Sequence, residues 1–438
     1  MRHLPKLLLA VLLAGAAAQA ADLYVAKDRG DNSNPGTKEA PFKNIESALK
    51  AAKAGDRILV ARGNYTGLRD KGYLEAAVPV ELIGGYTSDF SGRDPVRNPT
   101  TVIPDNESAG TGRKPLLTIA SVPAGSRFVL DGFILDRGAQ NAYSAKEGLV
   151  KGLGGRLLMP TEKPADGNST VAEPLVAGSK SGGVIEGDVV IQNCVFLNGH
   201  FGIQLGVRKG TIRILNNVFA GNTMAAVEIF GKGGKKGPKG PIEKDGHVEV
   251  ANNTILFTWS RTKELGDMGY GVRVMTMLSY DIRDNIIGHS VLTGIDHSRG
   301  NLNEWLKIDN NILFGDRVGA PMTYVEPGTS ATAKLPRVKI GDMNADLGLA
   351  SCKGNTADLG GAALPLNKTY AEAFQSVKYD EKTQLDRQSS ANVARQVHGQ
   401  NMQGTMTSSV TMFANRYPME DALKLFGAKA GKGAQAVK

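Results

Sequence analysis

One short sequence pattern recurs five times between about Gly187 and Val325, and it restricts the fold more than any other feature of the chain. Each copy begins as an alternating strand and ends in a polar corner. The copies are VVIQNCVF from Val189, IRILNNVF from Ile212, VEVANNTI from Val248, YDIRDNII from Tyr280 and LKIDNNIL from Leu306. Second short strands follow most copies: FGIQLG from Phe201, AAVEIFG from Ala225, YGVRVMT from Tyr270 and TGIDHS from Thr293. A repeat of roughly twenty to forty residues that is made of short strands indicates a solenoid.

The corner itself favours one kind of solenoid. Its first position carries Asn193, Asn216, Asn252, Asp284 and Asn310, and its second carries Cys194, Asn217, Asn253, Asn285 and Asn311. Asparagine tolerates a left-handed backbone, and its amide can form ladders from coil to coil. The leucine spacing and helix of a leucine-rich repeat are missing. We therefore predict an all-β protein, a single-stranded right-handed parallel β-helix. The corners of the five copies are 23, 36, 32 and 26 residues apart, so the longer coils must extend loops.

The region before the repeats predicts a strand, a polar turn, a helix near 44–54 and a further strand. Asn44 is the expected N-cap and Gly55 the expected end of this helix, which would cover the first coil. The turn Asn34-Pro35-Gly36-Thr37, the Pro41-Phe42 pair and this helix resemble the start of the secreted pectate-lyase-like β-helix superfamily. The resemblance covers most of residues 22–325 and implies the fold far more specifically than an activity.

The chain divides into three predicted parts. Residues 1–20 read as a signal peptide, 21–345 as the β-helix, and 346–438 as an irregular C-terminal cap and tail. Loop insertions are expected near 86–115, 137–182 and 231–245. Asp131 to Ile134 should lie in the corner register. Helical pieces around 369–377 and 418–426 are expected to close the far end, and the last dozen residues are predicted to be disordered.

The first twenty residues place Arg2 and Lys6 before an apolar run that ends in Ala18-Gln19-Ala20, which is typical of a Sec signal peptide. No later stretch approaches the ~20 apolar residues of a membrane helix, so we expect a periplasmic or secreted monomer. Losing Arg2 and Lys6 lowers the formal charge from +9 to +7. That charge favours an anionic partner such as a uronate polysaccharide, and export makes nucleic acid the least expected partner. The two cysteines, Cys194 and Cys352, leave a disulfide open as one alternative.

Polar residues in the second strands suggest where chemistry takes place. Alternation sends Ile203, Val227, Val272 and Ile295 inward, so the next column must point outward; it consists of Gln204, Glu228, Arg273 and Asp296. With coils about 4.8 Å apart, this predicts an outward strip about 15 Å long, suited to two or three sugar units. The alternative is that these residues are polar because they face water, with pairs such as Glu228 and Arg273 stabilising the sheet.

The residues around this column extend the predicted site. Lys232, Lys235 and Lys236 lie in the insertion after the second strand and would draw in anions, or would simply form a solvated loop. His297 and Arg299 follow Asp296 closely. His297, however, shares its column with apolar residues, so an inward-facing histidine is the alternative to a catalytic base.

β-Elimination of a uronate requires neutralisation of the carboxylate, a base and help for the leaving oxygen. The resemblance implies Ca²⁺ or basic side chains for the first task, with Lys or Arg as base. Glu228 and Asp296 are the candidate Ca²⁺ ligands. Arg273, Lys232 and His297 are the candidate catalytic residues, and Gln204, Glu228, Asp296, Lys235, Lys236 and Arg299 are the candidate substrate-binding residues.

Two functions follow from these residues. The first is an exported protein that binds an anionic, uronate-containing polysaccharide and cleaves it as a lyase. The alternative is a noncatalytic carbohydrate-binding or cell-envelope structural β-helix protein. Motifs of the polygalacturonase-like, mannuronan epimerase-like and chondroitinase-B-like groups are missing, which favours the alternative. The polar column and the basic loops favour the lyase.

Overall fold

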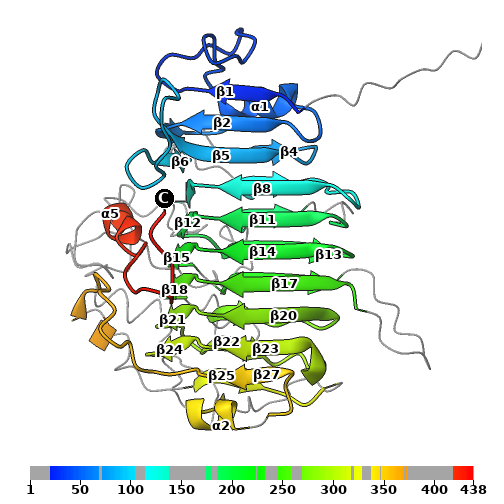
Figure 1. The fold of residues 1–438 in the computed structure, drawn as a ribbon, viewed down its shortest axis with the longest axis vertical. Helices are drawn as coiled ribbons and strands as arrows, with labels where there is room; N and C mark the ends of the chain where they lie inside the picture. The colour runs from blue at the N-terminus through cyan, green and yellow to red at the C-terminus, as the bar shows by residue number, and fades with distance from the viewer. Residues whose placement is uncertain are drawn as a thin grey trace, which may run out of the picture.

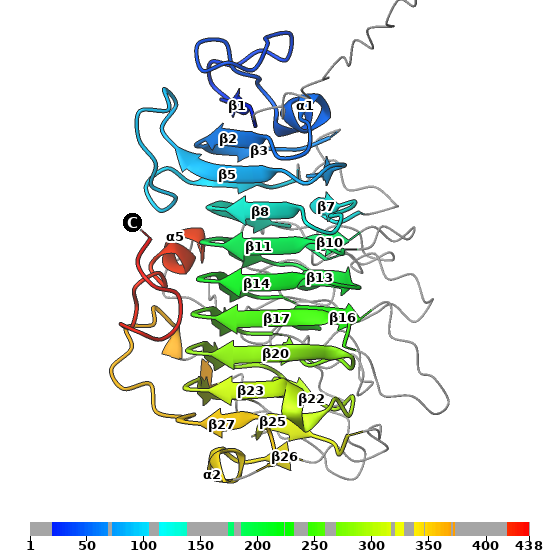
Figure 2. The ribbon, with the colours of Figure 1, turned by 45° about the vertical axis from the view of Figure 1, so that its right-hand side comes forward.

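The computed structural model describes residues 20–68, 72–104, 114–137, 174–178, 185–222, 224–231, 244–258, 269–316, 320–327, 337–345, 347–368, 371–372 and 418–437. Within them the chain winds into a tall stack of coils that carries three long sheets (Figures 1 and 2). The sheets are parallel throughout, apart from one terminal antiparallel pairing, β25 with β26. The predicted right-handed parallel β-helix is confirmed.

Most coils contribute one strand to each sheet. The 10-stranded sheet contains β1 (Asp22–Val25), β2 (Arg57–Ala61), β5 (Glu81–Tyr86), β8 (Arg127–Asp131), β11 (Asp188–Gln192), β14 (Thr211–Leu215), β17 (Gly246–Ala251), β20 (Leu278–Arg283), β23 (Leu306–Asp309) and β27 (Ser351–Lys353). The 8-stranded sheet contains β3 (Gly63–Tyr65), β6 (Thr100–Val102), β9 (Phe133–Asp136), β12 (Val195–Leu197), β15 (Val218–Ala220), β18 (Thr254–Leu256), β21 (Ile286–Gly288) and β24 (Ile312–Phe314). The 9-stranded sheet contains β4 (Leu74–Ala76), β7 (Leu117–Ile119), β10 (Val176–Gly178), β13 (Phe201–Val207), β16 (Ala225–Gly231), β19 (Tyr270–Arg273), β22 (Thr293–His297), β25 (Ala320–Tyr324) and β26 (Arg337–Val338).

The polar corner joins the 10-stranded sheet to the 8-stranded sheet. Its first position adopts a left-handed backbone, with φ between 53° and 58° in Asn193, Asn216, Asn252, Asp284 and Asn310. Gly132, with φ 74°, holds the same position one coil earlier, because Asp131 pairs in register with Gln192. The predicted corner register is therefore confirmed on both sides of the long insertion.

The second corner position forms a buried amide ladder. The backbone N–H of Asn217 donates to Asn253 Oδ1 at 2.9 Å, and the backbone N–H of Asn253 donates to Asn285 Oδ1 at 2.9 Å. The same pattern continues through Asn311 to Asn355. Cys194 begins the ladder by donating its backbone N–H to Asn217 Oδ1 at 2.9 Å. Cys194 and Cys352 are both free thiols, so the possible disulfide is not formed.

Apolar side chains fill the interior of the coils. The main core runs without interruption from Val25 to Met343 and includes Phe128, Phe196 and Phe219. Phe196 and Phe219 stack with ring centroids 4.7 Å apart. Alternation within each strand brings these side chains together from successive coils, which is how a solenoid buries surface that one repeat could not bury alone.

The N-terminal helix lies near its predicted position. Helix α1 (Ile45–Ala51) buries Ile45, Ala48 and Leu49 against the first coils, at the end of the stack where β1 lies (Figure 1). Asn44 holds the N-cap position without a capping hydrogen bond from its side chain, and the helix ends at Ala51, four residues before Gly55. No helix in the described part of the chain has the length and apolar character needed to cross a membrane.

Two predicted loops contain strands. Strand β6 lies inside the loop expected at 86–115, and strand β10 lies inside the excursion expected at 137–182. Each has three residues and pairs with neighbours on both sides. A three-residue strand is too short for its alternation to stand out in the sequence, and the sequence pattern therefore did not reveal these two strands.

The C-terminal segment differs most from the prediction. Helix α5 (Pro418–Leu423) does not close the far end; it packs beside β15, and the chain then runs along the 8-stranded sheet (Figure 1). Ala422, Leu425 and Ala434 are buried there. Residues 427–437, which were predicted to be disordered, have a defined course. The far end instead carries α2 (Ile340–Asn344), which contacts β25 and β27. The predicted helix around 369–377 lies largely outside the described residues.

Candidate functional site

The predicted polar column forms a true vertical row on the 9-stranded sheet. Gln204 pairs in register with Glu228, Glu228 with Arg273, and Arg273 with Asp296. The residues that precede them in each strand belong to the core, so the column lies on the opposite side of the sheet; they are Ile203, Val227, Val272 and Ile295. This stacking confirms the predicted register. The row continues to Thr323, which pairs with Asp296.

Hydrogen bonds connect the whole row. Gln204 Nε2 donates to Glu228 Oε1 at 2.8 Å. Arg273 bridges two carboxylates: Nη1 donates to Glu228 Oε2 at 3.1 Å, and Nε donates to Asp296 Oδ2 at 3.0 Å. Thr323 Oγ1 then donates to Asp296 Oδ1 at 2.7 Å. We call these five residues the ionic column.

The ionic column is not the exposed strip that alternation suggested. The side chains of Arg273, Glu228 and Asp296 are 3%, 8% and 0% exposed, and only Gln204 is partly accessible. Strand alternation determines the side of the sheet on which a residue lies, but not whether other parts of the protein cover that side. The prediction of a solvent-facing sugar track along these residues was therefore wrong.

Arg273 is held as a cation. Its guanidinium also lies over the Tyr270 ring, 4.6 Å from the centroid. Burial lowers the pKa of Arg273, but the opposing effects of Asp296, Tyr270 and Glu228 outweigh it, and the pKa is raised overall. A cation with a raised pKa opposes a role as the base that removes a proton.

The two proposed Ca²⁺ ligands do not converge. Glu228 and Asp296 lie two coils apart on either side of Arg273, and both direct a carboxylate oxygen at it. Among the described residues no group of three or more metal-ligating side chains comes together. A hard cation prefers six to eight oxygen ligands and is repelled by a guanidinium, so these residues do not fit a calcium ion.

His297 lies on the core side of its strand, away from the ionic column. It is fully buried and stacks on Tyr324, with ring centroids 5.0 Å apart. Burial lowers its pKa, which keeps the ring neutral near pH 7. The inward-facing alternative for His297 therefore agrees with the structure, while a role as a base beside Arg273 does not. Arg299 is exposed in the turn that follows.

The predicted lysine cluster cannot be placed relative to the column. Lys232, Lys235 and Lys236 all lie outside the described residues. Their proposed contribution to substrate binding therefore stays a prediction.

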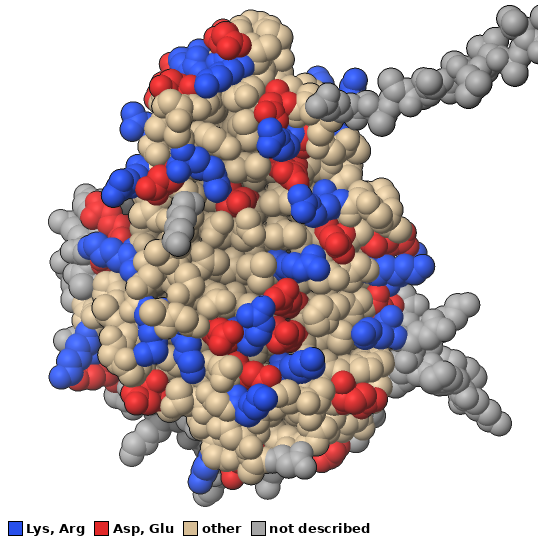
Figure 3. Space-filling view, in the orientation of Figure 1, with Lys and Arg blue, Asp and Glu red and all other residues tan. Residues whose placement is uncertain are grey.

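The outer face of the 10-stranded sheet carries the charged groups that sequence reasoning missed. Arg213 lies within 3.7 Å of Asp188 and 3.6 Å of Glu249, and Arg283 lies within 3.7 Å of Asp281 and also pairs with Glu249. Arg213 and Arg283 are each 38% exposed. Figure 3 shows positive and negative side chains alternating over the middle of the face where this sheet lies in Figure 1. The alternation of the first strand of each repeat contained this signal.

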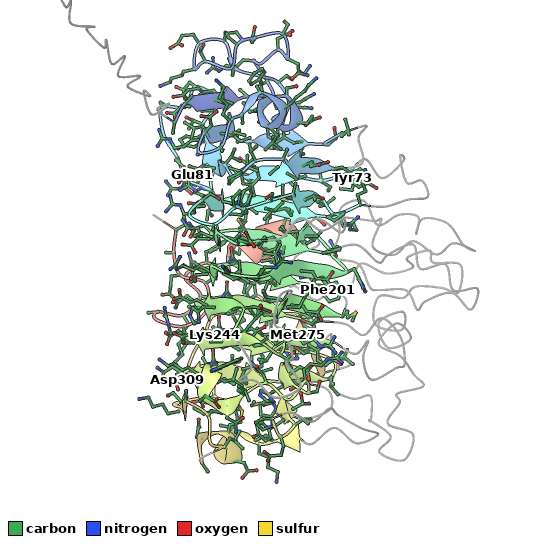
Figure 4. All side chains as sticks on the ribbon, turned by 90° about the vertical axis from the view of Figure 1, so that its right-hand side faces the viewer. Tyr73, Glu81, Phe201, Lys244, Met275 and Asp309 are labelled. Atoms are coloured by element: carbon green, nitrogen blue, oxygen red, sulfur yellow. The ribbon has the colours of Figure 1, made fainter. Side chains whose placement is uncertain are left out.

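The two faces lie on different sides of the solenoid. In Figure 4, Glu81, Lys244 and Asp309 lie along one side, whereas Phe201 and Met275 lie toward the 9-stranded sheet. Phe201 begins β13 and Met275 follows β19, the strand that carries Arg273. The buried ionic column and the open charged face are therefore separate surfaces.

Comparisons with known proteins found one family model and several solved structures. Residues 29–88 match a family model described as "Protein of unknown function (DUF1565)", and no curated protein matches the chain. Among solved structures, a pectate lyase, Pel9A, aligns with a TM-score of 0.40 and 12% identity over 84% of this chain and 88% of its own. A rhamnogalacturonan lyase aligns with a TM-score of 0.28 and 8% identity over 95% and 100%. The lacto-N-biosidase of Eubacterium ramulus aligns with a TM-score of 0.24 and 10% identity over 67% and 64%.

These likenesses concern the fold. The assignment rests on the protein's own coils: three parallel sheets, the asparagine corner and its buried ladder. The chain is a right-handed parallel β-helix protein.

Proposed function

We propose that this protein is exported and binds an anionic polysaccharide as a noncatalytic β-helix protein. The observation that carries the proposal is the contrast between its two polar surfaces. The ionic column is buried and internally paired, with Arg273 3% exposed. The 10-stranded sheet keeps charged side chains in contact with solvent on successive coils, for example Arg213 at 38% and Asp188 at 43%.

A regular face of this kind suits an extended polymer. Parallel strands repeat every ~4.8 Å, so side chains of one column lie at a fixed spacing along the solenoid. Glu249, Asp281 and Lys307 form one such column on consecutive strands of the sheet. The positive formal charge adds long-range attraction for polyanions, and lysine and arginine donate charge-assisted hydrogen bonds to carboxylates.

The test is retention of the full chain, without residues 1–20, by immobilised polymers. Polygalacturonate, alginate and a glycosaminoglycan should slow its migration in an affinity gel. The effect should be stronger at low salt, because added salt screens exposed ion pairs. A neutral xylan gel of equal concentration is the control. Equal migration in all four gels would contradict the proposal.

A uronate lyase is the second candidate, because one observation favours it. Burying Glu228, Arg273 and Asp296 outside the core costs desolvation energy that apolar residues would avoid, and costly charge clusters of this kind concentrate at functional sites. In such an enzyme the base would have to come from a residue other than Arg273, which Glu228 and Asp296 hold as a cation. Ultraviolet absorbance of the unsaturated product, measured on the same polymers with and without added Ca²⁺, tests this candidate. If the wild type produces this absorbance and R273M does not, the protein is a lyase and the noncatalytic proposal is wrong.

A further inference from the structure

A hollow on the outer face of the 10-stranded sheet has the chemistry of a saccharide subsite. It has a volume of about 290 Å³, and its lining includes Lys244, His247, Asp281, Glu304, Trp305 and Lys307. We call it the Trp305 hollow. Pockets for small ligands usually measure ~300–1,000 Å³, so this one has room for a small ligand or for one unit of a polymer.

The fold fixes the aromatic wall of the hollow. Trp305 ends a 3₁₀ turn, η4 (Asn303–Trp305), immediately before β23. Asn303 holds that turn: its Nδ2 donates to the Tyr324 hydroxyl at 2.9 Å, and its carbonyl accepts the backbone N–H of Ala350 at 3.0 Å. Trp305 is half-buried, and within the described part of the chain no residue accepts its indole N–H. A preorganised, partly exposed tryptophan offers an apolar face and a free donor together.

Three polar side chains of the hollow are available to a ligand. Lys244, Glu304 and Lys307 are exposed, and none of them forms an ion pair or side-chain hydrogen bond with another described residue. They contrast with Arg213 and Arg283 on the same sheet, which are already paired. Two cationic donors and a carboxylate acceptor therefore surround the tryptophan, and no described residue competes for them.

His247 adds a neutral acceptor. Its Nδ1 lies 2.8 Å from Ser279 Oγ, which itself lies 3.4 Å from the carbonyl oxygen of Gly246. If Ser279 donates to that carbonyl, its oxygen accepts Nδ1–H of His247, which leaves Nε2 as an acceptor. Burial lowers the pKa of His247, and Lys244 lowers it further against the opposing effect of Asp281. The ring is therefore neutral near pH 7 and suited to a hydroxyl group.

We propose that the Trp305 hollow binds one uronate unit of an acidic saccharide. The sugar ring packs on Trp305, Lys244 and Lys307 pair with the carboxylate, and the oxygens of Asp281 and Glu304 accept its hydroxyl groups. This inference rests on the proposed function, because it supplies the specific site for a polymer that the charged face attracts.

The experiment measures binding of uronate oligosaccharides and neutral oligosaccharides of equal length by calorimetry and fluorescence. The full chain carries two tryptophans, Trp259 and Trp305, so W259F leaves Trp305 as the sole tryptophan reporter. Adding the uronate should change its emission. W305A should weaken uronate binding at least tenfold, and K244Q/K307Q should remove the preference for the acidic ligand. K50Q, which changes one exposed lysine on α1, is the matched control and should bind like the wild type.

The outcomes separate this inference from the proposed function. If the wild-type chain binds no acidic polymer in the gel or the calorimeter, the proposed function fails and the hollow fails with it. If it binds, but W305A binds equally well and the emission of W259F does not change, the hollow is refuted while the function stands. If the lysine variant keeps its preference for the acidic ligand, the assignment of the carboxylate to Lys244 and Lys307 is wrong.

Discussion

Replacing Arg273 by methionine is expected to destabilise the protein far more than a matched change on the charged face. Arg273 is the only described cation between Glu228 and Asp296, at 3.1 and 3.0 Å. Both carboxylates are nearly inaccessible, so R273M would leave two buried charges without a counterion. Breaking a buried ion pair in this way typically costs ~3–5 kcal/mol. R283M, at a side chain 38% exposed, should cost no more than ~1 kcal/mol.

The assay compares guanidinium unfolding midpoints of the two variants, with amide hydrogen exchange of β16, β19 and β22 as a local readout. Coils of a solenoid contact mainly their neighbours, so faster exchange in R273M should be concentrated in these strands. E228Q/R273M/D296N removes all three charges and should recover at least half of the lost stability, because replacing a whole buried ionic group is often nearly neutral. Equal midpoints for R273M and R283M would refute the reasoning.

Two further variants test the corners of the coil. N253A removes the acceptor of the Asn217 backbone N–H and the donor to the Ile214 carbonyl. Buried groups left without a partner cost ~1–3 kcal/mol each, so its melting temperature should fall clearly. N310G, at an exposed corner position with φ 58°, should melt like the wild type. Similar melting of both variants would count against the ladder. Burial lowers the pKa of His289 to about 4, below its usual ~6.5. The fold thus favours the neutral ring, and this stability is present above pH ~6.5 and lost as the pH falls toward 4. Between pH 7 and 4, H289F should therefore lose up to ~3 kcal/mol less unfolding free energy than the wild type. If the urea midpoints of H289F and the wild type fall equally over this pH range, His289 does not have this role.

The stacking of the coils could be predicted from sequence because it depends on a local rule. Inward and outward residues alternate along each strand, and the corner asparagines fix where each strand ends. Aligning the corners therefore brought Glu228 and Arg273 next to each other correctly, across 45 residues of sequence. The same alignment placed Gly132 in the corner despite the insertion that follows it.

Accessibility could not be predicted in the same way. Whether Asp296 faces water depends on everything that packs over the 9-stranded sheet, and no pattern within β22 encodes that. The Trp305 hollow was missed for a related reason. It combines side chains from β17, β20, η4 and β23, and only the coil register brings them together.

The C-terminal segment was mispredicted because its composition hides its interactions. Residues 427–437 are mostly glycine, alanine and lysine, which is typical of disorder. Their order comes from backbone groups: the N–H of Gly433 donates to the Asp284 carbonyl at 2.8 Å, and the N–H of Ala434 donates to Thr254 Oγ1 at 2.9 Å. Hydrophobic patterning cannot detect contacts of that kind.

The C-terminal segment is matched in length to the part of the solenoid that it contacts. Gln435 bonds to Asn216, Asn252 donates to the Gly431 carbonyl at 3.3 Å, and Gly433 reaches Asp284, so a few residues touch the corners of three consecutive coils. Gly433 has φ 68°, and an added Cβ would lie 2.6 Å from Ile286 Cδ1, so the segment packs tightly against the coils at this position. Solenoids usually change length easily by gaining or losing a repeat. Here a repeat added or removed between Asn216 and Asp284 would put the segment out of register, so natural variation in coil number should occur outside this stretch.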